Sequence, residues 1–350
     1  MNTEPHSPTA KIAPAEGRAI NLRRGWMACF MVCVGVAAIS VASAKQQVGS
    51  LTRFTYTEYH MGIDARIVVY APDLGKAERA CTAAFARIAE LDTIMSDYRR
   101  DSELNRLSDA AGGPAVHVSR DLFLVLKRSE EVSRVSDGAF DITAGPLIAL
   151  WRQARKSGVL PDPSAIRDAL QKVGWQRIVL DEKAQTAQLT TPGMRLDLGG
   201  IAKGYAADEA QKELKRLGLT RALVEMGGDV VLSGPPPGTK GWTIRVPNAG
   251  VGQVPRDILF ADSAISTSGD TEQFTIIGGV QYSHIVDPRT GQALTNRVQA
   301  SIVGPIGLTT DPLATALSVL GREGEQRLLK AYRGATSYVK VLKGVSGSKG

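Results

Sequence analysis

The most concentrated set of residues that could do chemistry lies in residues 195–208, which read R-L-D-L-G-G-I-A-K-G-Y-A-A-D. We expect a strand to end at Asp197 and to run into Gly199 and Gly200, where the absence of side chains lets the backbone approach a ligand closely. Lys203 then opens a helix whose first amides could face an anion. The segment could therefore hold a nucleotide or a phosphate, although it lacks the spacing of a Walker loop. A plain glycine turn with a surface aspartate and lysine is the alternative.

A second set of oxygen-bearing side chains lies in residues 310–321, which read T-D-P-L-A-T-A-L-S-V-L-G. Asp311 followed by Pro312 predicts a helix N-cap with proline in the first helical position. Thr315 lies four residues after Asp311, so a helix would bring both side chains to one face. Two hard oxygen donors at one helix start suit a cation of the Mg²⁺ type. An ordinary helix cap is the alternative interpretation of Asp311.

His284 is the third candidate, within residues 283–291, S-H-I-V-D-P-R-T-G. We expect a strand before it and a tight turn after it, and the ends of strands near loops commonly present catalytic groups. Histidine is suited to such a role because its proton equilibrium lies near neutral pH. A structural role for this histidine stays open on the sequence alone.

The elements that would position these residues follow from the periodicity of the apolar side chains. The clearest is an amphipathic helix over residues 74–95, and a second helix opens at the N-cap candidate Ser119 and stops before Gly138. Two further helices are predicted over residues 163–173 and 203–217. Short strands are predicted at 65–70, 177–181, 187–190, 222–225, 242–246, 272–277 and 281–286. Because consecutive strands in the second half lack helices between them, we predict an α+β fold and not a doubly wound parallel sheet.

The composition allows a full hydrophobic core and excludes some partners. The chain has 350 residues, of which 43% are hydrophobic, and this is enough for one large domain or two modest ones. Its formal net charge of +7 is spread along the sequence, and no Lys/Arg run alternates with aromatic residues, so no nucleic acid is expected as a partner. Cys81 is the only cysteine outside residues 1–44, so we predict no internal disulfide.

Residues 1–44 are predicted to form a signal peptide. Arg23 and Arg24 precede an uncharged apolar run over residues 26–41, and Ala42-Ser43-Ala44 supplies the small-x-small pattern of a cleavage site. The alternative is a retained anchor in the inner membrane, because the apolar run approaches spanning length. In both cases we expect the body of the chain to be exported and to face the periplasm.

Eight segments, in their order along the chain, resemble the ApbE family of FAD:protein FMN transferases, from about residue 59 to residue 321. The segments are Met61-Gly62, M-S-D-Y-R-R-D-S-E-L-N-R-L from Met95, S-D-G-A-F-D-I-T-A-G-P-L from Ser136, R-L-D-L-G-G-I-A-K-G-Y-A-A-D, E-M-G-G-D, S-T-S-G-D, S-H-I-V-D-P-R-T-G and D-P-L-A-T-A-L. A chance match to all of them in this order is not credible. The resemblance implies a mixed-sheet, T-fold-related α+β domain with flanking helices over residues 45–345.

The resemblance also implies roles for individual residues. The family's contacts with FAD fall on Met61, Tyr98, Ala139, Phe140, Asp141, Asp197, Lys203 and the backbone near Ile285. Its metal ligands fall on the backbone carbonyl of Gly200 and the side chains of Asp311 and Thr315, which would make the predicted helix cap a Mg²⁺ site. His284 falls on the histidine proposed to assist the transfer, so the catalytic residues would be His284 and the metal-binding Asp311.

The chain departs from the usual family pattern at three places. Ile63 stands where threonine usually follows Met-Gly, and Thr271 replaces the aromatic residue common after S-T-S-G-D. Pro247-Asn248 differs from the usual acidic D-P turn. None of these positions is an inferred metal ligand, but the first two could alter flavin affinity or the fit of a partner.

The function implied by the resemblance is that of a Mg²⁺-dependent FAD:protein FMN transferase. Such an enzyme cleaves FAD, attaches FMN through a phosphodiester bond to a serine or threonine of an acceptor flavoprotein, and releases AMP. FAD is then the substrate, Mg²⁺ the cofactor and the acceptor flavoprotein the partner, with the chain peripheral to or anchored at the membrane if the leader is retained. Two alternatives use the same pocket: an FAD pyrophosphatase that releases FMN and AMP, and a non-catalytic periplasmic FAD-binding protein.

Overall fold

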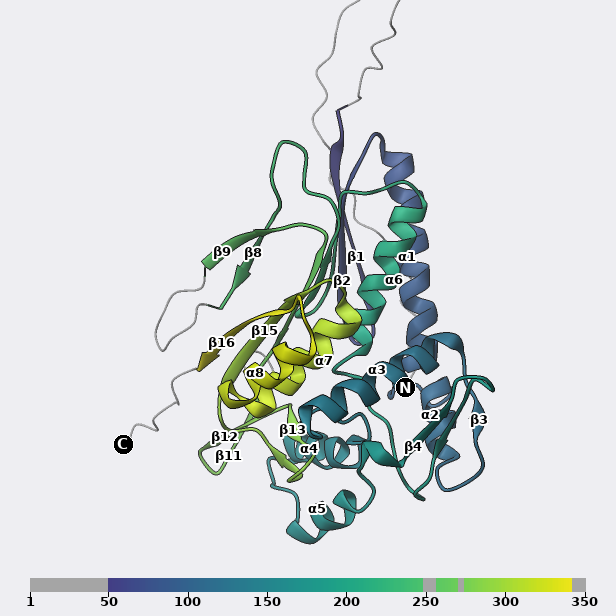
Figure 1. Cartoon of the computed structure of the whole chain (residues 1–350), viewed down its shortest axis with the longest axis vertical. Helices are drawn as coiled ribbons and strands as arrows, with labels where there is room; N and C mark the ends of the chain where they lie inside the picture. The colour runs from purple at the N-terminus through teal and green to yellow at the C-terminus, as the bar shows by residue number, and fades with distance from the viewer. Residues whose placement is uncertain (1–49, 248–255, 270–273, 342–350) are drawn as a thin grey trace, which may run out of the picture. The chain divides into compact units, whose positions relative to one another are not determined.

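A seven-stranded sheet forms the centre of the fold (Figure 1). The structure is a computed structural model that describes residues 50–247, 256–269 and 274–341. The strands of the large sheet follow one another in the order β1 (Thr52–His60), β2 (Ile63–Ala71), β6 (Ala222–Met226), β7 (Asp229–Leu232), β10 (Ser263–Ser268), β15 (Val298–Gly304) and β16 (Thr336–Val341).

The strands of this sheet are antiparallel in every neighbouring pair. Tight hairpins join β1 to β2 and β6 to β7, and a tight hairpin can join only antiparallel strands. The predicted α+β class is confirmed, and the antiparallel pairing agrees with the expectation that the fold is not a doubly wound parallel sheet.

Helices and four small sheets surround the large sheet. The helices in the described part of the chain are α1 (Leu74–Met95), α2 (Glu103–Asp109), α3 (Arg120–Ser136), α4 (Gly145–Ser157), α5 (Pro163–Leu170), α6 (Ala202–Arg216), α7 (Gly307–Leu320) and α8 (Arg322–Ala331), with a 3₁₀ turn at Trp175–Arg177. The small sheets are β3 (Val116–His117) with β5 (Thr186–Leu189) and β4 (Ile178–Asp181), β8 (Trp242–Val246) with β9 (Arg256–Phe260), β11 (Phe274–Ile277) with β12 (Val280–Ser283), and β13 (Val286–Asp287) with β14 (Gln292–Ala293).

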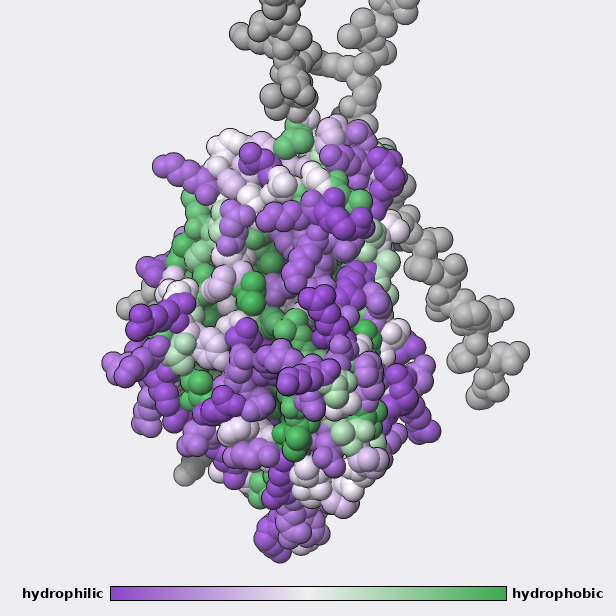
Figure 2. Space-filling view, turned by 45° about the vertical axis from the view of Figure 1, so that its right-hand side comes forward, coloured by the Kyte–Doolittle hydropathy of each residue, from purple (hydrophilic) through white to green (hydrophobic). Residues whose placement is uncertain are grey.

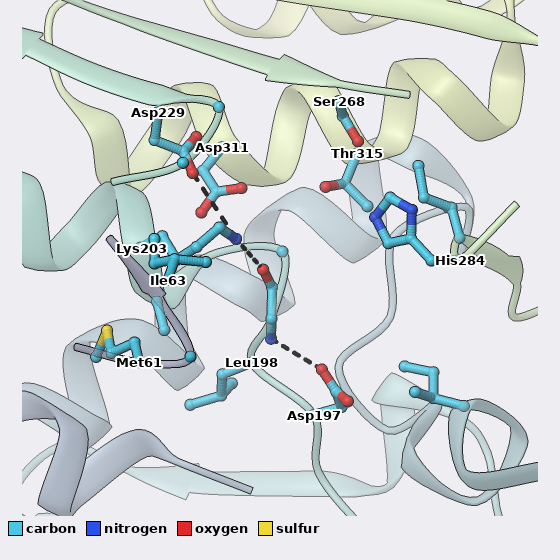
Figure 3. A pocket seen from close by; sticks show the side chains of 18 of the residues that line it. Met61, Ile63, Asp197, Leu198, Lys203, Asp229, Ser268, His284, Asp311 and Thr315 are labelled. Carbon is cyan, nitrogen blue, oxygen red and sulfur yellow. Dashed lines mark hydrogen bonds and ion pairs between the residues drawn. The ribbon is translucent and has the colours of Figure 1, made fainter. Parts of the chain in front are cut away.

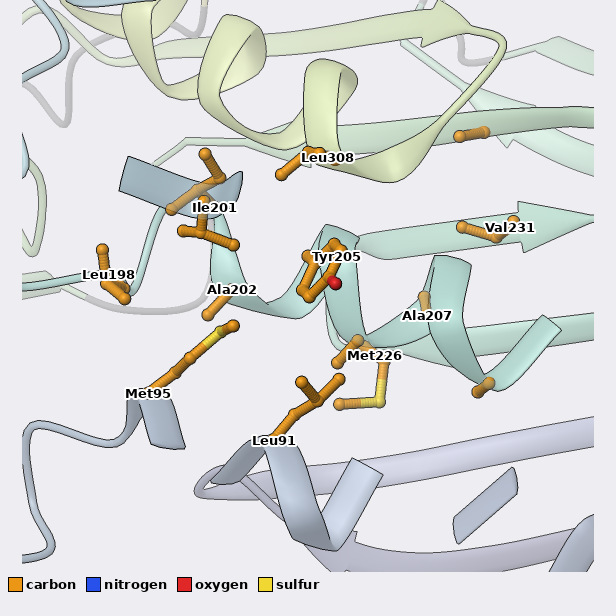
Figure 4. Packing of buried hydrophobic residues seen from close by; sticks show 14 of the residues in the cluster. Leu91, Met95, Leu198, Ile201, Ala202, Tyr205, Ala207, Met226, Val231 and Leu308 are labelled. Atoms are coloured by element: carbon orange, nitrogen blue, oxygen red, sulfur yellow. The ribbon is translucent and has the colours of Figure 1, made fainter. Parts of the chain in front are cut away.

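The main hydrophobic core lies between the large sheet and helices α1, α6 and α7. Helices α1 and α6 lie side by side (Figure 1), and Figure 4 shows Leu91 and Met95 of α1 directed toward Ala202 and Tyr205 at the start of α6. Met226 of β6 packs against the same residues from the side of the sheet. Because the start of α6 is packed in this core, residues that precede and open the helix have fixed positions.

The opposite face of the sheet is covered by the β8–β9 hairpin. Trp242 of β8 packs with Val68, Leu223 and Ile265, and its indole N–H donates to the carbonyl of Gly234 at 3.1 Å. Burial of so large a side chain with a satisfied N–H fixes the hairpin against the sheet.

Helices α6 and α7 cross at a pair of glycines. A methyl group at Gly204 would overlap the carbonyl of Gly307, and a methyl group at Gly307 would overlap that of Gly204. Asp208 of α6 also accepts hydrogen bonds from the backbone N–H groups of Gly307 at 2.7 Å and Leu308 at 2.8 Å. The first turn of α7 is therefore held against α6 by backbone contact and by a buried carboxylate.

Several sequence-based expectations agree closely with these elements. Helix α1 covers residues 74–95 as predicted. The Ser119 hydroxyl accepts from the backbone N–H of Leu122 and caps α3. This helix ends at Ser136, and its C-cap residue Asp137 is left-handed, directly before Gly138. Helix α6 begins at Ala202, one residue before the predicted start.

Two expectations about local structure are wrong. Asp311 is not an N-cap: α7 begins at Gly307, and Asp311 and Pro312 lie inside the helix. The cap is supplied by Asp208 from α6, which the sequence around Asp311 cannot reveal. No strand ends at Asp197, because Arg195 makes only an isolated bridge with Ala144.

Residues 1–44, for which we predict a signal peptide, lie outside the described residues, as do Asn248 and Thr271. Within the described ranges, no helix combines the length and the apolar character that crossing a membrane requires.

Candidate active site

A cavity of about 930 Å³ opens beside the start of α6 and helix α7, in the size range of small-molecule sites. All the residues that the sequence predicted for the site line this cavity: Met61, Tyr98, Ala139, Phe140, Asp141, Asp197, Gly200, Lys203, His284, Ile285, Asp311 and Thr315. The surface outside is largely hydrophilic, with small hydrophobic areas between polar side chains on the face in Figure 2. The fold therefore brings together residues that are up to 254 positions apart, from Met61 to Thr315.

The β1–β2 turn forms one wall of the cavity. His60 pairs with Ile63, so the turn consists of Met61 and Gly62 alone, with φ of 50° and 79°. Two left-handed residues are typical of a tight hairpin turn, but methionine adopts this conformation rarely. Met61 and Ile63 lie on the same side of the cavity as Lys203 (Figure 3). Backbone strain at a residue that faces a cavity is a common property of functional sites.

A buried group of charges lies on the floor of the cavity. The Lys203 ammonium donates to the carbonyl of Gly199 and lies 3.7 Å from a carboxylate oxygen of Asp229. Asp311 lies beside them (Figure 3), and its carboxylate accepts from the backbone N–H of Gly204 at 3.1 Å. Asp229 and Asp311 are almost fully buried. The single ammonium group of Lys203 therefore offsets the charge of two carboxylates that are shielded from water.

The acid–base equilibria of this group reflect the uneven charge. Burial raises the pKa of Asp229 to about 7, with the negative charge of Asp311 adding to the shift and Lys203 opposing it. Burial also raises the pKa of Asp311, against the effect of Lys203 and the Gly204 N–H. Burial alone would lower the pKa of Lys203, but Asp311, Asp229 and Asp197 outweigh it and raise that pKa. With Asp229 and Asp311 both ionised, the floor carries two negative charges against one positive charge, and a bound cation would favour that ionised state.

The predicted metal ligands supply oxygen donors next to this charge. A methyl group at Gly200 would come within 2.9 Å of the Thr315 hydroxyl, so the Gly200 backbone lies against that side chain. Asp311 and Thr315 are four residues apart on α7 and share one face of it. A carbonyl, a carboxylate and a hydroxyl are the hard donors that Mg²⁺ accepts, usually together with water and substrate oxygens.

Protein side chains alone do not complete such a site. Within the residues that the structure describes, no three His, Cys, Asp or Glu side chains are arranged to hold a metal ion. The donor set at Gly200, Asp311 and Thr315 therefore fits a cation whose remaining ligands come from water or from a phosphorylated ligand.

His284 follows the last residue of β12 and lines the cavity. Its imidazole lies near Thr315 and Ser268 (Figure 3), across the cavity from Met61. The ring is thus placed to exchange a proton with a group bound between the floor and β12.

Two of the predicted flavin contacts are carboxylates already engaged by the protein. Asp141 accepts from the backbone N–H and the hydroxyl of Thr143 and from the N–H of Trp175, at 2.7 to 2.9 Å. Burial raises the pKa of Asp141, and these donors oppose the rise. Asp197 accepts from the N–H of Gly199 at 2.8 Å and from Arg152 at 2.8 Å. Both side chains fix the cavity wall, whatever contacts they also make with a ligand.

Sequence reasoning missed two charged residues of the site, Arg152 and Asp229. Asp229 ends the segment E-M-G-G-D, in which a carboxylate next to two glycines follows a predicted strand, so the residue types that singled out Asp197 are present here in a different order. Arg152 lies on α4 beside the predicted G-P-L segment, and its spacing from Arg155 puts both side chains on one helical face. Both line the cavity.

Comparison with known proteins gives one consistent result. The sequence model of the ApbE family matches residues 61–339. A FAD:protein FMN transferase of Treponema pallidum is 31% identical over 326 residues, which cover 88% of this chain and 89% of that protein. One of Klebsiella pneumoniae is 32% identical over 273 residues, covering 77% of this chain and 83% of that protein. The structure of the flavin transferase ApbE from Vibrio cholerae superposes with a TM-score of 0.74 at 29% identity, covering 83% of this chain and 97% of that one.

Proposed function

This chain belongs to the ApbE family and is a transferase, and on that premise we propose that it moves FMN from FAD to a protein hydroxyl group, with Mg²⁺ as cofactor. The acceptor is a serine or threonine of a flavoprotein, and AMP is the second product. The observation that carries this proposal is the convergence of Gly200, Lys203, Asp311 and Thr315 on one cavity floor beside His284.

The proposed reaction exchanges one phosphorus–oxygen bond for another. The acceptor hydroxyl attacks the phosphorus atom on the FMN side of the FAD diphosphate, and the bond from this phosphorus to the bridging oxygen breaks. AMP leaves with the bridging oxygen, and the hydroxyl proton passes to a base. The product is a phosphodiester between FMN and the acceptor side chain.

The residues on the floor support this reaction through position and charge. Lys203 carries a positive charge next to where a diphosphate would lie against Asp311 and Thr315. When bound, Mg²⁺ would neutralise phosphate charge as AMP leaves. Gly200, Asp311 and Thr315 would hold it through the oxygens described above. Electrostatic positioning of this kind supplies most of the catalysis in phosphoryl transfer.

His284 is proposed as the general base that accepts the proton of the acceptor hydroxyl. Its position at the end of β12, on the other side of the cavity from the β1–β2 turn, leaves room for an acceptor side chain between them. A base contributes less than the charge of the floor, because the acceptor hydroxyl loses its proton late in a loose transition state.

The acceptor is proposed to be an exported flavoprotein, because residues 1–44 have the pattern of a signal peptide or membrane anchor. Fusion of residues 1–60 to a reporter enzyme that is active only in the periplasm tests this. An inactive fusion, with the protein present in the cytoplasm, contradicts export.

The decisive experiment incubates the purified protein with FAD, Mg²⁺ and a candidate acceptor, and then examines the denatured acceptor for flavin fluorescence in a gel. Covalent fluorescence and an equal amount of AMP are expected. An acceptor whose target hydroxyl is removed by Ser→Ala or Thr→Ala, and a reaction with EDTA, are the matched controls.

Two other outcomes would contradict flavin transfer. Free FMN and AMP without labelled acceptor would identify an FAD pyrophosphatase. Recovery of intact FAD under conditions where binding is complete would identify a carrier.

A further inference from the structure

Arg152 contacts three groups of the cavity wall at once. Its guanidinium donates to the carboxylate of Asp97, and to that of Asp197 at 2.8 Å. The same guanidinium lies over the ring of Tyr98, 4.6 Å from the ring centroid. One side chain of α4 thus joins the segment that follows α1 to the segment that precedes α6.

The three contacts have different consequences. Asp197 is buried, and without Arg152 its carboxylate would lose the larger of the two cationic contributions, the other from Lys203, that oppose the charge repulsion from Asp97. Tyr98, in contrast, is 75% exposed. An exposed aromatic ring on a loop normally samples several rotamers, and fixing one costs conformational entropy. A planar guanidinium stacked on one face of the ring holds it in place before any ligand arrives.

We propose that Arg152 is a positioning residue that presents Tyr98 as a preformed stacking surface for one of the two aromatic ring systems of the dinucleotide substrate. The identity of the ligand rests on the proposed function, since FAD is its substrate. Arg152 acts through Tyr98 and does not itself contact the reacting atoms.

The surroundings of Tyr98 favour a flat aromatic ligand. The ring lines the same cavity as Lys203 and Asp311, so a molecule with its diphosphate on the floor can extend toward it. Aromatic rings pack face to face with an offset or edge to face, and a ring fixed on one side binds such a partner at a smaller entropic cost. FAD carries an isoalloxazine and an adenine, and either could be the partner.

A double-mutant cycle tests the proposal. FAD affinity is measured by calorimetry with EDTA, so that the dinucleotide stays intact, for Tyr98→Ala, Arg152→Lys and the double variant. Lysine keeps the positive charge near Asp197 but cannot bridge two carboxylates and lie flat on a ring. We expect each single variant to bind FAD about tenfold more weakly, and the double variant to bind about tenfold, not a hundredfold, more weakly.

Arg245→Met is the matched control. Arg245 lines the same cavity and pairs with Asp257 at 2.8 Å, yet among the described residues its guanidinium does not lie over an aromatic ring. Its effect on FAD affinity should be additive with that of Tyr98→Ala. Additive effects for Arg152→Lys as well would overturn the proposal, and thermal unfolding of each variant shows whether it is folded.

The two halves of FAD identify the ring. Affinities for FMN and AMP are measured separately with the same variants, and the fragment that carries the stacked ring should repeat the non-additive pattern. A loss that is equal for both fragments, or absent from both, would contradict stacking on Tyr98. The binding measurements contain no acceptor protein. Additive losses in them would therefore refute the role of Arg152 and say nothing against flavin transfer. Conversely, a negative transfer assay would leave the binding result valid.

Discussion

The floor and the mouth of the cavity are held in place by different kinds of interaction. On the floor, Lys203, Asp229 and Asp311 are held by buried contacts between α6, α7 and the β6–β7 turn, with backbone against backbone at Gly204. At the mouth, Tyr98 is exposed and is held by the side chain of Arg152. Changes on the floor should therefore abolish chemistry or loosen the fold, whereas changes at the mouth should alter affinity.

The largest effect should follow from removal of a floor carboxylate. Asp311→Ala is expected to lower the rate of flavin transfer by about 10⁴-fold, and EDTA should act similarly, because charge neutralisation dominates phosphoryl transfer. The measurement is the initial rate of AMP release and acceptor labelling under saturating FAD. Retention of more than a tenth of the activity would mean that the floor does not hold the cation.

His284→Ala should have a smaller effect, on the order of 10²-fold, as expected for loss of a general base. The rate is compared with that of Asp311→Ala at several pH values, after FAD occupancy has been verified for both variants. A loss equal to or greater than that of Asp311→Ala would reverse the ranking of charge over proton transfer.

The stability of the α6–α7 contact should depend on pH through Asp208. Burial raises the pKa of this carboxyl group from 3.8 to about 6, against the two N–H donors of α7. The folded state then binds more protons than the unfolded state between these values. The free energy of unfolding should therefore fall by up to about 3 kcal/mol as the pH rises from about 4 to about 6.

Chemical denaturation over this pH range, compared with Asp208→Asn, isolates the effect. Asparagine keeps an oxygen acceptor for one backbone N–H but cannot ionise. The difference in unfolding free energy between the two proteins should change with pH over this interval, and a constant difference would contradict the assigned shift.

Gly204→Ala should lower the free energy of unfolding by about 1–3 kcal/mol, because the added methyl group overlaps the carbonyl of Gly307 and must separate the helices. Gly75→Ala in the first turn of α1 is the control. There the nearest atom is the end of the flexible Arg79 side chain at 3.3 Å, and a helical Gly→Ala change usually stabilises. Equal stability of the two variants would show that the glycine contact is not needed.

The sequence predicted best those structural features, such as helix bounds and caps, that depend on residues close together in the chain. The periodicity of residues 74–95 gave the bounds of α1, and the Ser119 cap is present. The family resemblance gave site residues that all line one cavity. Their individual roles as flavin or metal ligands stay predictions.

What the sequence could not reveal depends on long-range contacts. The start of α7 is fixed by Asp208, about 100 positions away, so the local Asp-Pro signal indicated the wrong residue. Arg152 bridges Asp97 and Asp197, which are 55 and 45 residues away in the sequence, so its role is visible only in the folded chain. A short sequence motif does not indicate contacts between residues so far apart in the chain.

The hydrogen bonds of Asp141 bear on how such a site is interpreted from related sequences. Its carboxylate is occupied by Thr143 and Trp175, so the loop with Ala139 and Phe140 keeps its shape through a charge that points into the protein. An acidic residue that a family motif places beside a ligand pocket can therefore hold a loop in shape and need not recognise the ligand.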